Sequence, residues 1–226
     1  MKSILLFIIL FNVVIFAQEK FEIKNASKIY DVRVEVAGCN DWKCEGKTTF
    51  TLFKKGEQKP FQAIEFESSE FMLEEVRLKS SKTLYDAQSI VFFEDYNFDG
   101  AADLALRDGF NGGYGGPSYS VYLFSPKNKK FVYSKEFTEL AQGVYLGMFE
   151  VFPKRKVLRT LSKSGCCWHQ MEEFAVVNNR PKKVLEVTED ATASNRRNGD
   201  KVKVTTRKLA GGRWRTSIKY EPLLRD

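Results

Sequence analysis

Short segments in which apolar residues recur at every second position run through this chain of 226 residues. Val32, Val34 and Val36, for example, alternate with charged residues. Side chains alternate between the two faces of a β-strand, so this spacing predicts strands with one buried face. Brief turn sequences such as Lys54–Gln58 separate the segments and favour antiparallel hairpins. We therefore predict an all-β fold with propeller-like or sandwich-like antiparallel sheets.

The predicted strands cover most of the chain. They span residues 29–36, 48–53, 60–66, 71–78, 89–93, 118–124, 130–133, 144–152, 157–161, 172–177, 184–188, 201–206 and 214–220. Only residues 136–142 have the pattern of a helical turn or two. The composition, 43% hydrophobic and 29% charged, excludes a disordered chain. The length favours a single all-β domain over residues 18–226.

The first 17 residues have the order of a secretory signal peptide. Lys2 precedes an apolar run from Ile4 to Phe16, and the small residue Ala17 ends it. A run of this length is too short to cross a bilayer core of about 30 Å. We expect cleavage after Ala17, no membrane span in the mature chain, and a periplasmic or secreted protein.

Export affects how the four cysteines are interpreted. Cys39 and Cys44 lie between strand-like segments, where a disulfide would close a short hairpin loop. Cys166 and Cys167 are adjacent, and they form either a vicinal disulfide or pairs elsewhere. A metal site made of Cys166, Cys167 and His169 is the alternative, although this spacing matches no common zinc pattern.

The charge of +7 is unevenly distributed. Residues 18–110 contain 13 Lys/Arg and 18 Asp/Glu, whereas residues 111–226 contain 22 and 11. A basic half outside the cytoplasm suggests an anionic envelope polymer or an acidic partner. The alternative is an ordinary solvated surface. No nucleic-acid-binding motif accompanies the charge, so we expect no nucleic-acid partner.

The acidic segment 95–103 has the spacing of a calcium loop. Its oxygen-bearing residues fall at positions 1, 3, 5 and 9, and Gly100 at position 6 allows a sharp turn. The predicted Ca²⁺ ligands are the side chains of Asp95, Asn97, Asp99 and Asp103 and the carbonyl of Ala101. An EF-hand would need Glu at position 12, where this chain has Leu106. The flanking residues resemble strands, so we predict a strand-loop-strand calcium site; an Asx-rich turn without metal is the alternative.

A glycine-rich segment follows, with five glycines in residues 109–116. It lacks the Gly-Lys-Ser/Thr of a phosphate loop. We expect it to present Tyr114 to a partner near the stiffened calcium loop, because tyrosine offers a large contact area at low entropic cost. The alternative is a plain hairpin connection with Tyr114 packed against the protein.

Catalytic signatures are weak. His169 is the single histidine, and neither a G-x-S-x-G elbow nor an H-E-x-x-H motif occurs. A glycosidase-like carboxylate pair stays open among 29 acidic residues. We expect a protein that is not an enzyme.

Four segments together resemble a known family: residues 92–104, residues 115–124, the first cysteine pair with its flanks (36–46), and Ser164–His169. The first two are similar to calcium loops of VCBS and FG-GAP repeats. The set resembles bacterial periplasmic immunity proteins, relatives of lysozyme inhibitors, that neutralise peptidoglycan-hydrolase effectors of type IV secretion.

This resemblance implies a propeller-like fold, one bound Ca²⁺, and a protruding loop that plugs a lysozyme-like cleft. The matching loop here is Gly112–Tyr119, with Tyr114, Ser118 and Tyr119 as partner contacts. The leading hypothesis is therefore a secreted calcium-binding inhibitor of a peptidoglycan hydrolase. The alternative is a calcium-stabilised adhesion or glycan-binding module of the cell envelope.

Overall fold

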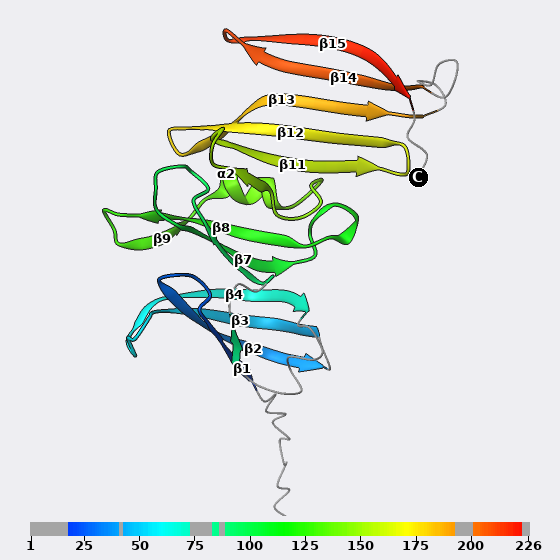
Figure 1. Ribbon diagram of the computed structural model, residues 1–226. Coiled ribbons are helices and arrows are strands. Elements are labelled where there is room, and N and C mark those ends of the chain that lie inside the picture. Colours follow the sequence, from blue (N-terminus) through cyan, green and yellow to red (C-terminus); the bar gives the residue numbers. More distant parts are fainter. Residues whose placement is uncertain (1–17, 41–42, 73–82, 86–88, 193–200, 223–226) are drawn as a thin grey trace, which may run out of the picture.

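The computed structural model describes residues 18–40, 43–72, 83–85, 89–192 and 201–222, which form three open β-sheets stacked in chain order (Figure 1). The N-terminal sheet has the order β4-β3-β2-β1-β5, the middle sheet β6-β7-β8-β9, and the C-terminal sheet β10 to β15 in sequence. The strands of the N-terminal sheet are β1 (Glu19–Lys24), β2 (Tyr30–Asn40), β3 (Lys43–Lys54), β4 (Pro60–Met72) and β5 (Thr83–Tyr85). Those of the middle sheet are β6 (Val91–Glu94), β7 (Asp103–Gly109), β8 (Ser118–Ser125) and β9 (Lys130–Tyr133). Those of the C-terminal sheet are β10 (Glu150–Phe152), β11 (Val157–Ser164), β12 (Trp168–Val177), β13 (Arg180–Asp190), β14 (Lys201–Ala210) and β15 (Arg213–Pro222).

The all-β prediction is confirmed, and among the described strands every pairing is antiparallel except that of β1 with β5. The described strands show no closed sheet and no propeller. The helical turn expected at residues 136–142 is present as α2 (Lys135–Thr138) and η2 (Glu139–Ala141). The prediction of a strand over residues 144–152 is wrong for residues 144–149, because the strand β10 begins only at Glu150. The signal-peptide prediction lies outside the described residues.

β7 is the structural centre of the stack because it is buried on both faces. Leu104 and Leu106 join the apolar core shared with the N-terminal sheet. Ala105, between them, joins the core shared with the C-terminal sheet and α2. A strand covered on both faces needs no polar alternation, which explains the continuous apolar run in its sequence.

Aromatic rings fill the core between the N-terminal and middle sheets. The ring of Tyr30 stacks on Phe93 with centroids 5.6 Å apart, and it meets Phe131 edge-on at 5.6 Å. The side-chain amide of Gln62 in β4 bonds to both backbone groups of Phe131 in β9, as a neighbouring strand would. Its Nε2 donates to the carbonyl of Phe131 at 2.9 Å, and its Oε1 accepts from the amide of Phe131 at 2.8 Å.

The second core anchors the acidic segment. Tyr96, which is 1% exposed, places its ring edge-on against Phe149 with centroids 5.2 Å apart. Phe149 also packs against Phe137 of α2 and belongs to the same cluster as Phe174 of β12. The ring of Tyr96 therefore ties the β6–β7 connection to the C-terminal sheet.

We predict that Tyr96→Ala lowers the free energy of unfolding by about 3–5 kcal/mol, the usual cost of deleting a buried aromatic side chain. Tyr96→Phe keeps the ring and should cost less than about 1.5 kcal/mol. Urea denaturation measures both. Equal losses for the two variants would contradict packing of the ring as the cause.

Candidate functional site

The acidic segment between β6 and β7 is curled by hydrogen bonds to its own backbone. The carboxylate of Asp95 accepts from the amides of Asp99 at 3.0 Å and Gly100 at 2.9 Å. The carboxylate of Asp99 accepts from the amide of Ala101 at 2.8 Å. Gly100 has φ +90°, a conformation that L side chains rarely adopt, as the predicted sharp turn requires.

Asp103 is turned into the protein and is fully buried. One carboxylate oxygen accepts from the amides of Tyr96 at 2.9 Å and Asn97 at 3.3 Å, and the other accepts from Phe124 of β8 at 2.8 Å. Burial raises the pKa of the Asp103 carboxyl to about 7, and the three amides act in the opposite direction. The side chain closes the loop and joins it to the middle sheet.

The donor set of this loop contains only oxygen, which is the chemistry that Ca²⁺ prefers. The positions of these oxygens are less favourable for binding a metal ion than their chemistry. In the described part of the chain, no group of three or more His, Cys, Asp or Glu side chains is placed to hold a metal ion. The carboxylates of Asp95, Asp99 and Asp103 bind backbone amides of the same segment, as in Asx turns. Calcium binding stays a prediction.

The acidic loop and the glycine-rich loop lie at opposite ends of β7. One precedes the strand and the other follows it, so its seven residues separate them by roughly 20 Å. Their expected proximity is therefore wrong. The acidic loop contacts the β12–β13 turn, where Asn97 Nδ2 donates to Asn179 Oδ1 at 3.3 Å. The glycine-rich loop contacts the β11–β12 turn at the other end of β12.

Close backbone packing shapes the glycine-rich loop, which contains the short helix η1 (Gly113–Gly115). The amide of Gly112 donates to the carbonyl of Gly116 at 3.0 Å, and that of Gly113 donates to Tyr145 at 2.6 Å. A Cβ added at Gly112 would lie 2.6 Å from the carbonyl oxygen of Pro117, and one at Gly113 would lie 2.7 Å from that of Val144. Larger residues would therefore push the loop away from its neighbours.

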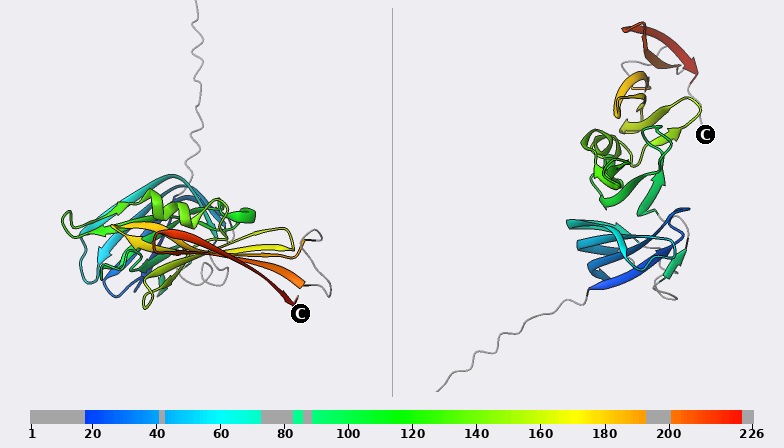
Figure 2. Two further views of the ribbon diagram at one scale, coloured as in Figure 1. Left: turned by 90° about the horizontal axis from the view of Figure 1, so that it is seen from above. Right: turned by 90° about the vertical axis from the view of Figure 1, so that its left-hand side faces the viewer.

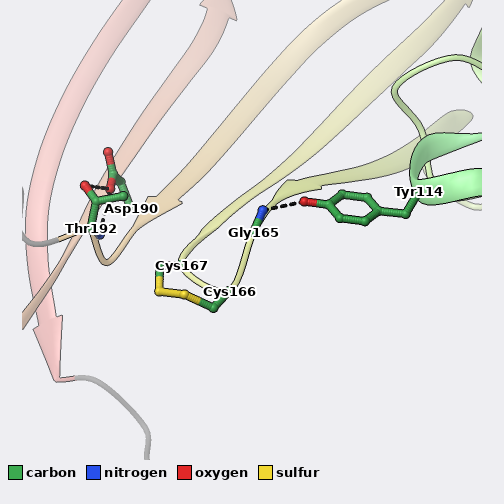
Figure 3. The surroundings of a disulfide bond; sticks show 6 residues. All are labelled: Tyr114, Gly165, Cys166, Cys167, Asp190 and Thr192. Carbon is green, nitrogen blue, oxygen red and sulfur yellow. Dashed lines mark hydrogen bonds between the residues drawn. A yellow bond between two sulfur atoms is a disulfide. The ribbon is translucent and has the colours of Figure 1, made fainter.

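Tyr114 is 66% exposed and yet held at its tip (Figure 3). Its hydroxyl accepts a hydrogen bond from the amide of Gly165 in the β11–β12 turn. Lys163 Nζ lies 5.0 Å from the ring centroid. The backbone of Tyr114 has φ 58°, an unusual value for a residue other than glycine. The ring thus faces solvent in a defined position.

Ser118 and Tyr119 are not surface residues, which corrects their prediction as partner contacts. Both lie in β8, with 0% and 4% exposure. The Ser118 hydroxyl donates to Asp108 at 2.5 Å, and the Tyr119 hydroxyl donates to the carbonyl of Ser89 at 2.9 Å. These bonds hold the base of the loop.

Three exposed apolar side chains beside Tyr114 were not predicted. Val144, Leu146 and Leu161 are exposed, and backbone bonds bring their segments to the loop: Gly113 donates to Tyr145, and Leu146 donates to Leu161 at 2.9 Å. We call Tyr114, Val144, Leu146 and Leu161 the Tyr114 patch. The sequence suggested a strand over residues 144–152, and nothing in it indicated that Val144 and Leu146 would be exposed while Phe149 is buried.

Both cysteine pairs form disulfides. Cys39 and Cys44 lie opposite each other on β2 and β3, as predicted. Cys166 and Cys167 form a vicinal disulfide in the β11–β12 turn (Figure 3), which rules out the alternative thiolate site with His169. The carbonyl of Cys167 accepts from the amide of Ala191 at 2.7 Å. Two disulfides indicate an oxidising, extracytoplasmic compartment. Among the described residues, none of the helices has the length and apolar character needed to cross a membrane.

Neither a protein-family model nor a curated protein matches the sequence. A solved structure described as that of a Xanthomonas type IV secretion system related protein is similar to this one. The two superimpose with a TM-score of 0.67 at 23% identity, over 91% of this chain and 96% of that chain. At this level of identity the likeness establishes a shared fold.

We predict that Asp103→Ala lowers the free energy of unfolding by about 3 kcal/mol or more, because three buried amides lose their acceptor. This loss should persist in chelator, since these bonds need no metal, and calcium should add only the contribution of a lost ligand. Chemical denaturation in both buffers measures it. A loss confined to calcium-containing buffer would show that Asp103 acts only as a metal ligand.

We predict that replacing Cys166 and Cys167 together by Ser raises the hydrogen-exchange rate of the Gly165 amide by roughly tenfold, because the turn that supports its bond to Tyr114 loses a covalent ring. Exchange measured by NMR tests this. The double variant of Cys39 and Cys44 is the control and should leave Gly165 unchanged. Unchanged protection in the first variant would show that the vicinal disulfide does not hold the tyrosine.

Proposed function

We propose that this protein is a secreted, non-enzymatic inhibitor of a lysozyme-like peptidoglycan hydrolase and that the Tyr114 patch contacts the enzyme. The observation that carries the proposal is the exposed ring of Tyr114, fixed by its bond to Gly165 within an apolar surface. Exposed apolar groups that cluster on a soluble domain mark interaction sites.

The patch is held in place before a partner binds. The glycine-rich loop is packed against the segment around Tyr145, so the partner does not have to order it. Pre-organisation of this kind reduces the entropic cost of binding. Val144, Leu146 and Leu161 add exposed apolar surface on segments whose backbones are bonded to the loop or to each other, and Lys163 lies over the Tyr114 ring, so a partner would meet apolar surface together with a cation. Tyrosine is enriched among binding hot spots.

The shared fold adds support of a different kind. A protein described as related to a type IV secretion system has this fold over nearly its whole length. Such a relationship agrees with the immunity role that the sequence resemblance implies, in which an exported protein neutralises a wall-degrading effector. The two disulfides agree with a site of action outside the cytoplasm.

We predict that Tyr114→Ala weakens inhibition of the target muramidase by at least thirtyfold, about 2 kcal/mol, as expected for a central aromatic contact. Turbidity assays of cell-wall digestion give the inhibition constants. Tyr133→Ala is the matched control, because Tyr133 is 51% exposed on β9 and lies outside the patch. Failure of the wild-type protein to slow any muramidase or other wall hydrolase would contradict the proposal.

We further propose that Ca²⁺ binds the acidic loop through Asp95, Asn97, Asp99, Asp103 and the carbonyl of Ala101. Binding would require their oxygens to exchange some backbone bonds for the ion. Its effect would be to fasten the end of the middle sheet that contacts Asn179, away from the Tyr114 patch. Calcium would thus stabilise the fold without touching the partner.

We predict that Asp99→Ala removes a calcium-linked stabilisation of about 2.7 kcal/mol when the ion is a hundredfold above its dissociation constant. The variant should melt as the wild type does in chelator, apart from about 1 kcal/mol for the lost turn bond. Thermal denaturation with and without calcium measures this difference. Its affinity for the hydrolase should stay within threefold of wild type. A calcium-independent melting curve for the wild type would refute the metal site.

A further inference from the structure

The hairpin of β14 and β15 is the outermost part of the C-terminal sheet (Figures 1 and 2). Its last strand, β15, is exposed on both faces, and most residues of β14 are partly exposed. In β15 every residue from Arg213 to Lys219 is exposed. Among the described residues of the hairpin only Val204 is buried. The hairpin therefore adds little to either core.

Its charge is strongly one-sided. Residues 201–222 contain seven Lys/Arg residues and a single acidic residue, Glu221, which pairs with Lys219. Lys208 and Arg215 lie directly opposite each other in the strand register. Like charges in this position destabilise a sheet. Neither side chain takes part in an ion pair within the described chain.

The other face of the hairpin combines a cation with apolar groups. The guanidinium of Arg207 lies 5.3 Å from the ring of Trp214 and pairs with Glu186 at 3.1 Å. Trp214 is 40% exposed, and Ile218, on the same face, is 56% exposed. A flat indole in such a setting offers a stacking surface for a sugar ring next to positive charge.

We propose that this hairpin is a second binding surface and that its ligand is a phosphate-bearing polysaccharide of the cell envelope. Phosphates between Lys208 and Arg215 would relieve their repulsion, since a polyanion is attracted to a concentrated positive field. A flexible polymer can contact both faces of a ribbon, whereas a rigid partner covers one. The β14–β15 edge of the C-terminal sheet would then hold the protein in the envelope, while Tyr114, at the β11–β12 turn, stays available to the hydrolase.

The test measures binding of the whole mature protein to immobilised phosphomannan, with neutral mannan as the matched polymer. We expect binding to phosphomannan alone. Lys208→Glu with Arg215→Glu should weaken it at least tenfold. Lys127→Glu with Lys130→Glu changes the net charge equally in the exposed β8–β9 hairpin and should weaken it less than threefold. The milder pair Lys208→Gln with Arg215→Gln repeats the test if the first variant unfolds on melting analysis.

Equal loss in the two Glu variants would show attraction to net charge alone and would overturn the proposal. Equal binding to both polymers would also overturn it, as would binding to phosphatidylglycerol vesicles without binding to phosphomannan. Inhibition of the hydrolase should be unchanged by the hairpin variants, so failure here is distinguishable from failure of the proposed inhibitory role.

Discussion

Burial of β7 on both faces is the constraint on which the rest of the structure depends. The side chains of Leu104 and Leu106 join one core and that of Ala105 joins the other, so this strand holds together two layers that share no core of their own. Any polar substitution at these positions would leave an unpaired group in an apolar surround. The rigidity of the strand fixes what happens at its two ends.

Each end of β7 carries one loop, and each loop meets a different turn of the C-terminal sheet. At the beginning of the strand, Asp103 closes the acidic loop, and Asn97 reaches Asn179. Beyond its end, Tyr114 reaches Gly165 next to the vicinal disulfide. This arrangement places the acidic loop and the proposed recognition surface at opposite ends of one strand.

The alternating pattern was sufficient to predict most strands, because a half-buried strand needs apolar residues at every second position. The sequence pattern did not predict β1 or β5. β5 is only three residues long, which is too short for a pattern to be visible. The segment 144–149 has the composition of a strand, but the backbone bond from Gly113 to Tyr145 ties it to the glycine-rich loop, and it forms an irregular turn in which Val144 and Leu146 are exposed and Phe149 is buried. Such contacts between distant segments are not visible in a single sequence.

The same limit applies to the candidate site. Tyr114 was identified from its glycine-rich surroundings, which do permit close backbone packing. Ser118 and Tyr119 were misjudged because the loop was expected to extend to residue 119, whereas β8 begins at Ser118 and buries both. The pairing of Cys166 with Cys167 was one of several open alternatives, since adjacency alone does not exclude other partners. Val144, Leu146 and Leu161 became part of the site only through the fold.

Photocross-linking tests the central claim most directly, namely that recognition occurs at the Tyr114 end of the molecule and not at the acidic loop. A benzoylphenylalanine residue placed at position 114 or at position 99 would be irradiated in an envelope extract, and the captured proteins would be identified by mass spectrometry. The account predicts a peptidoglycan hydrolase captured from position 114 and none from position 99. Capture of the hydrolase from position 99 alone would contradict it.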